Sequence, residues 1–125
     1  MNLPRISAAV LAIACAASAH AEGDAARGQA LYQSRCTACH SPDHSGVGPA
    51  HRGVVGRAAG QAPGYANYSP ALKASGLTWN DATLDRWLAD PEKLVPGQRM
   101  GVNVPDVAER ADLIAYLKQL SAPKK

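Results

Sequence analysis

The feature that most constrains this chain is the pentapeptide Cys36-Thr37-Ala38-Cys39-His40. At this spacing each thiol can add to one vinyl group of a porphyrin, and the adjacent histidine then lies under the iron. The motif therefore predicts one covalently attached haem c, with His40 as an axial ligand. The chain has no phenylalanine, and a bound apolar cofactor would supply core that its side chains do not.

Three other sites use a close pair of cysteines. A thioredoxin-like pair needs a preceding strand in a βαβ context, and the sequence around Cys36 has neither. A zinc site needs two further ligands at suitable spacing, and no second cysteine pair exists. A plain disulfide between Cys36 and Cys39 would constrain little chain and add little stability.

The first 21 residues have the pattern of an export signal. Arg5 is followed by an apolar run over 6–19, which is too short to span a bilayer, and Ala19-His20-Ala21 matches a cleavage site. We expect cleavage after Ala21, which leaves one domain over residues 22–125. An uncleaved membrane anchor and lipidation at Cys15 are the alternatives.

The charge balance is mild, with 13 Lys and Arg against 10 Asp and Glu. A nucleic-acid-binding protein needs a concentrated basic footprint, so this function is not expected. We also expect no stable membrane insertion of the domain.

Helical signals occur in three places, and strand patterns are absent. A helix is expected from Ala25 to about Arg35, and another follows a possible capping box from Thr78 to Asp81 and ends near Asp90, before Pro91. The last runs from about Ala108 to Leu120. The stretches 41–76 and 95–107 are rich in Gly and Pro, and the long first one would be explained by wrapping a large ligand. The chain is thus expected to be an α protein with long loops.

Met100 is the candidate for the second axial ligand. It is the only methionine outside the expected signal and lies in a polar, turn-rich segment, where a core methionine is unexpected. A thioether ligand favours ferrous iron and raises the reduction potential. His44 and His51 leave bis-histidine ligation as the alternative, and Lys73 and Lys93 are weaker candidates because an ammonium must first lose its proton.

Several further motifs accompany the Cys-His pentapeptide and the methionine. They are Gly23-Asp24 with Gly28, Gly48-Pro49, Gly56-Arg57, Gly60 to Tyr65, Thr78-Trp79, Pro96-Gly97 with Met100, and Glu109 to Leu117. With these motifs the whole of residues 22–125 resembles the class I cytochrome c family, the small soluble type, and the short loop after His40 points to a bacterial form. The resemblance implies the all-α cytochrome c fold, with three to five short helices and long loops around one haem.

The resemblance also implies roles for individual residues. Pro49 would offer its carbonyl to the second ring nitrogen of His40. Three residues would hydrogen-bond the haem propionates, namely Arg57, Tyr68 and Trp79. Gly28 and Tyr32 would pack against Leu113 and Tyr116 where the first and last helices cross.

Some positions depart from the family pattern. Trp87 stands where a tyrosine commonly bonds the methionine sulfur, which would affect the potential. His51 and Arg52 replace an apolar residue and a histidine. The ring of basic residues around the haem edge is thin, and its candidates are Arg52, Arg57, Lys73, Lys93 and Arg99.

The resemblance implies a monomeric periplasmic electron carrier, not an enzyme. Its expected partners are a membrane oxidoreductase as donor and an oxidase, reductase or peroxidase as acceptor. A haem sensor with an open sixth site and a cytochrome subunit of a dehydrogenase complex are the alternatives.

Overall fold

The structure, a computed structural model, describes residues 22–124, so the expected export signal and its cleavage site after Ala21 lie outside the described residues. Within this range the chain forms five helices and no strand. The helices are α1 (Ala25–Arg35), α2 (Pro70–Lys73), α3 (Asp81–Ala89), α4 (Pro91–Leu94) and α5 (Val107–Ser121). The presence of helices alone among the described residues confirms the prediction of an all-α fold.

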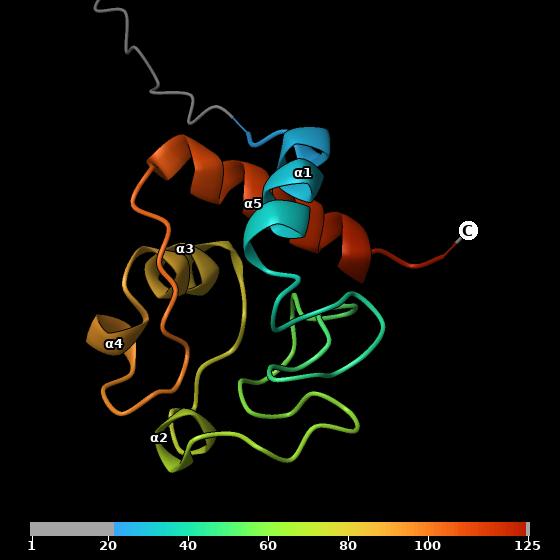
Figure 1. Ribbon diagram of the computed structural model, residues 1–125. Coiled ribbons are helices and arrows are strands. Elements are labelled where there is room, and N and C mark those ends of the chain that lie inside the picture. Colours follow the sequence, from blue (N-terminus) through green and yellow to red (C-terminus); the bar gives the residue numbers. More distant parts are fainter. Residues whose placement is uncertain (1–21, 125) are drawn as a thin grey trace, which may run out of the picture.

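The first and last helices cross at one end of the molecule (Figure 1). Gly28 makes the close approach possible, because a Cβ atom at this position would lie 1.9 Å from the carbonyl oxygen of Asp112. Beside it, the rings of Tyr32 and Tyr116 meet edge to face with centroids 5.2 Å apart, and Leu113 is 1% exposed. The predicted packing of these two helices is confirmed.

A charged network ties the start of α1 to α5. The Asp24 carboxylate caps α1 by accepting the Arg27 N–H. The buried Asp112 carboxylate accepts the Asp24 N–H at 2.7 Å and the Arg27 Nε–H at 3.0 Å. These bonds to Arg27 and Asp24 hold the pKa of Asp112 below its usual value. The helix crossing therefore has a polar clamp beside its apolar contact.

The capping box of α3 differs from the prediction. Asn80, not Thr78, is the N-cap, and its side chain accepts the N–H of Thr83 while the Thr83 hydroxyl accepts the N–H of Asn80. Thr78 contributes only its carbonyl, which accepts the Thr83 hydroxyl at 2.7 Å. The prediction was wrong because an amide side chain also makes a good N-cap, and Asn80 is the residue adjacent to the first helical turn.

Two single-turn helices lie where the sequence predicted no helix. Ser69 caps α2, and Asp90 caps α4. In both, a proline at the first helical position has a φ angle that suits the helix and lacks the N–H that would be unpaired there. Asp90 also ends α3, so the helix stops at the predicted residue and the chain turns directly into α4.

The remaining chain wraps beneath the helix crossing, with the loops after α1 facing the side formed by α3 and α4 (Figure 1). Buried residues from all these parts form one apolar cluster, against which Met100 and Cys36 are partly buried. None of the helices described is long and apolar enough to cross a membrane.

Candidate functional site

The predicted site residues meet at one cavity of about 300 Å³. Its walls come from the loops after α1, from α3 and from the loop between α4 and α5. All eight residues predicted to bind the cofactor line it: Cys36, Cys39, His40, Pro49, Arg57, Tyr68, Trp79 and Met100. These eight residues are up to 64 positions apart in sequence, and they meet at one cavity because the loops fold back across the helices.

The two cysteines lie in a tight turn that ends α1. The Cys36 carbonyl accepts the N–H groups of Cys39 at 3.1 Å and His40 at 2.8 Å, which brings the three side chains of the motif onto one wall. Both cysteines are free thiols, so they do not form the plain disulfide considered above. Burial raises the pKa of Cys36 to about 11.

His40 is held by the segment that follows it. Its Nδ1 lies 2.7 Å from the carbonyl oxygen of Pro49, which can only accept a hydrogen bond. Nδ1 therefore carries the proton, and Nε2 has a free lone pair. Burial also lowers the pKa of the His40 ring, although the bond to Pro49 opposes this effect. The result is a neutral imidazole whose Nε2 is suited to bind iron.

Gly48 and His51 both contact the His40 ring. A Cβ atom at Gly48 would lie 2.2 Å from Cε1 of His40, so only glycine fits there. The His51 ring stacks on His40 with centroids 4.2 Å apart and planes 24° apart. Its Nδ1 lies 2.9 Å from the Tyr32 hydroxyl. The sequence marked His51 as unusual, but no local pattern indicated that it would contact both residues.

Arg57 and Trp79 are joined by a backbone hydrogen bond, and both line the cavity together with Tyr68. The carbonyl of Arg57 accepts the N–H of Trp79 at 2.9 Å, and the Arg57 guanidinium donates to the carbonyl of Ala50 at 3.2 Å. Burial lowers the pKa of this guanidinium, while nearby Tyr68 opposes the shift. A partly buried cation beside two aromatic side chains with polar atoms is suited to carboxylate groups at the cavity wall.

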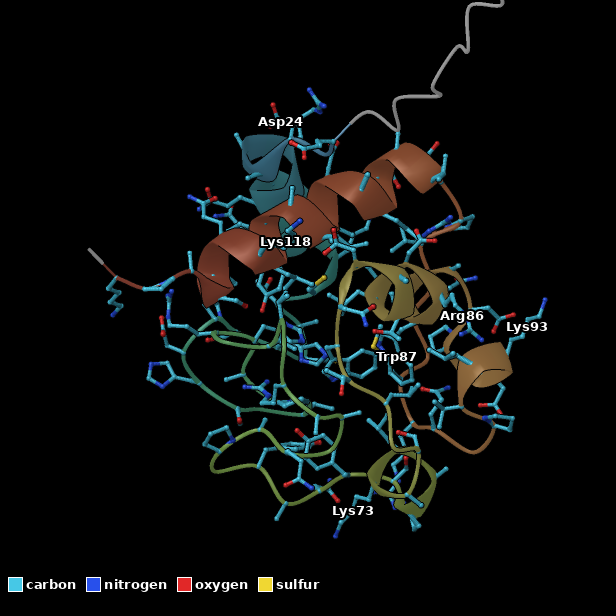
Figure 2. The ribbon with its side chains drawn as sticks, turned by 180° about the vertical axis from the view of Figure 1, so that it is seen from behind. Asp24, Lys73, Arg86, Trp87, Lys93 and Lys118 are labelled. Carbon is cyan, nitrogen blue, oxygen red and sulfur yellow. The ribbon has the colours of Figure 1, made fainter. Side chains whose placement is uncertain are left out.

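Met100 lies with Trp87 at the cavity, on the side formed by α3 and the loop after α4. Figure 2 shows Trp87 pointing from α3 into the interior, where its ring meets Trp79 edge to face at 5.4 Å. Lys73 and Lys93, the weaker ligand candidates, instead project outward (Figure 2). The structure thus places Met100, and neither lysine, at the cavity.

The loop that carries Met100 is braced by a polar chain that the sequence did not reveal. The Glu92 carboxylate accepts the N–H of Gly97 at 2.9 Å and the side-chain amide N–H of Gln98 at 3.1 Å. The side-chain oxygen of Gln98 accepts the N–H of Met100 at 2.5 Å. Because a carboxylate only accepts and an N–H only donates, the amide orientation of Gln98 is set by its two partners.

The donor set fits a covalently attached haem. Two thiols stand beside an imidazole with a free lone pair, and a thioether lies at the same apolar cavity. Arg57 lines the cavity and would supply a positive charge for the two propionates of a porphyrin. No group of three or more His, Cys, Asp or Glu side chains among residues 22–124 forms a separate metal site.

Comparisons with known proteins agree with this fit. Residues 25–121 match the profile of the cytochrome c family. Cytochrome c2 of Rhodomicrobium vannielii is 42% identical over 121 residues, which are 94% of this chain and 95% of the relative. Cytochrome c of Tetrahymena pyriformis is 46% identical over 101 residues, 79% of this chain and 91% of the relative. The solved structure of cytochrome cH from Methylobacterium extorquens superposes with a TM-score of 0.73 at 50% identity, covering 78% of this chain and 99% of that one.

Proposed function

Because the chain belongs to the cytochrome c family, we propose that His40 and Met100 are the two axial ligands of its haem iron. Members of this family carry electrons on covalently attached haem c; this chain is such an electron carrier and not an enzyme. The observation that carries the ligand assignment is that Met100 and the Cys-His motif line the same cavity.

When bound, haem c supplies one-electron chemistry by cycling its iron between the ferrous and ferric states. The residues of this chain hold the cofactor and tune it. Cys36 and Cys39 attach it, and Pro49 fixes the tautomer that leaves the His40 lone pair free. The Met100 thioether favours the ferrous state.

The walls of the cavity have two further roles. Trp87, Leu84 and Leu88 form an apolar side that keeps water from the cofactor. Arg57, together with Tyr68 and Trp79, binds the propionates, whose charge would be costly to bury without partners.

As an electron carrier, the chain exchanges electrons with redox proteins. We place it in the periplasm, with residues 1–21 removed during export, and propose a membrane oxidoreductase as donor and an oxidase, reductase or peroxidase as acceptor. The export pattern of residues 1–21 and the likeness to a bacterial cytochrome c2 support this placement. The mass of the purified protein's N-terminal peptide tests it.

Only part of the predicted basic ring is available to a partner. Arg52 forms a salt bridge with Asp43, and Arg57 is engaged at the cavity. Lys73, Lys93 and Arg99 are exposed, and the Arg99 guanidinium also donates to Asn67 at the rim of the cavity. With so few exposed basic residues, we expect the monomeric protein to bind its redox partners weakly, with an affinity that depends only mildly on salt concentration.

The ligand assignment is tested by Met100→Ala in the haem-loaded protein. The wild type should show the far-red absorption band of a methionine sulfur bound to ferric iron and should not bind carbon monoxide readily when reduced. The variant should lose the band, and its potential should fall by about tenths of a volt, within the ~0.8 V range that axial ligands span. Val107→Ala, a change at a side chain that is 67% exposed, is the control and should keep both properties. An unchanged potential in Met100→Ala would show that another group ligates the iron.

A further inference from the structure

One contact at the cavity has no role in the ligand set described above. The imidazole of His51 lies flat against the imidazole of His40, with ring centroids 4.2 Å apart. A second constraint comes from Gly48, where a Cβ atom would overlap the His40 ring. His40 is therefore confined by a backbone segment and by a second aromatic ring.

The His51 ring is itself anchored. Its Nδ1 bonds the hydroxyl of Tyr32 at 2.9 Å, and the two rings meet edge to face at 5.6 Å. Tyr32 is 2% exposed and packs against Tyr116 in the crossing of α1 and α5. The backbone of His51 is also fixed, because its N–H donates to the Ser41 carbonyl at 3.1 Å. A chain of contacts thus runs from the helix crossing to the proposed iron ligand.

An apolar side chain in place of His51 could fill the same space, but it could not form a directed bond to Tyr32. A hydrogen bond has a preferred direction, whereas apolar contact does not. The specific consequence of having histidine here is orientation.

We propose that His51 is a positioning residue, which, anchored by the Tyr32 hydroxyl, holds the His40 ring at one rotation about the axis through its iron-binding nitrogen. This inference rests on the proposed ligation of iron by His40. The bond from His40 to Pro49 restrains the same rotation at one edge of the ring. Stacking by His51 restrains the whole plane.

The rotation of an axial imidazole decides which iron orbital its π system overlaps. In a ferric low-spin haem this sets how unpaired spin is distributed among the four methyl groups of the porphyrin. The proton NMR spectrum of the oxidised protein therefore reports the orientation of His40 through the order and spread of the four shifted methyl signals.

The experiment compares His51→Leu, His51→Phe and Tyr32→Phe in the haem-loaded protein. His51→Leu removes the stacked ring and should change the order or spread of the methyl signals. Tyr32→Phe removes only the anchor and should shift them in the same direction by less. His51→Phe keeps a ring without its ring nitrogens and should lie closer to the wild type than His51→Leu does.

Tyr116→Phe is the matched control, because it removes a hydroxyl from the ring packed beside Tyr32 without touching the bond to His51. Its methyl signals should match the wild type. If His51→Leu and Tyr32→Phe both gave the wild-type pattern, the proposal would be overturned. If His51→Leu did not fold, the comparison of the methyl signals of Tyr32→Phe with those of Tyr116→Phe would decide: a shift in Tyr32→Phe alone would support the proposal, and wild-type signals in both would overturn it. The far-red band of the wild type separates these results from a failure of the Met100 assignment.

Discussion

The polar chain from Glu92 through Gln98 to Met100 leads to a quantitative prediction about the proposed sulfur ligand. Gln98→Ala removes two hydrogen bonds, one to the Glu92 carboxylate and one from the Met100 N–H. A typical hydrogen bond contributes about 0.5–1.5 kcal/mol, and Glu92 is exposed, so water partly replaces the lost partner. We therefore take the lower half of this range, about 0.5–1 kcal/mol for each of the two bonds, and expect the loop to be destabilised by about 1–2 kcal/mol in total.

This destabilisation should appear as easier displacement of Met100 from the iron. Imidazole added to the ferric protein competes with the thioether, so its apparent affinity depends on how often the loop opens. A cost of about 1–2 kcal/mol predicts that Gln98→Ala binds imidazole roughly 5- to 30-fold more tightly than the wild type. Loss of the far-red band during an imidazole titration gives this affinity.

Two further variants sharpen the test. Gln119→Ala changes an exposed glutamine on α5, away from the loop, and should bind imidazole as the wild type does. Glu92→Ala should also strengthen binding, and its effect should not add fully to that of Gln98→Ala because the two side chains share a bond. Equal imidazole affinity in Gln98→Ala and Gln119→Ala would refute the bracing role of this chain.

Two other predictions concern the crossing of α1 and α5. Gly28→Ala places a Cβ atom 1.9 Å from a backbone oxygen, so the two helices must move apart. Urea unfolding should show that the free energy of unfolding falls by about 1–3 kcal/mol. Gln29→Ala, on the exposed face of α1, is the control and should change this free energy little. The lowered pKa of Asp112 means that its contribution to stability is full above the unfolded pKa of about 3.9 and is lost as the pH falls through the folded value. Asp112→Asn should therefore have a lower free energy of unfolding than the wild type at neutral pH. The difference between the two proteins should become smaller in acid. A difference that stayed constant with pH would contradict the stabilising role of the ionised Asp112 carboxylate.

The local features of this protein could be predicted because each depends on neighbouring residues. The cysteine and histidine spacing of the haem motif lies within five consecutive residues, and the apolar positions of α3 and α5 repeat at the helical period. The start of α3 was predicted less well, because Asn80 and not Thr78 is its N-cap. The helices α2 and α4 were not predicted, because a single turn is too short to show a helical period.

The amino-acid sequence by itself determined the cofactor, the helical class and the identity of the candidate ligands, since covalent attachment and donor chemistry belong to individual side chains. Tertiary structure alone decided which side chains meet. The stacking of His51 on His40, its bond to Tyr32 and the Glu92–Gln98 brace all depend on how loops without a repeating pattern fold back on the helices. Such contacts arise from the packing of the whole chain, and no spacing along the sequence encodes them.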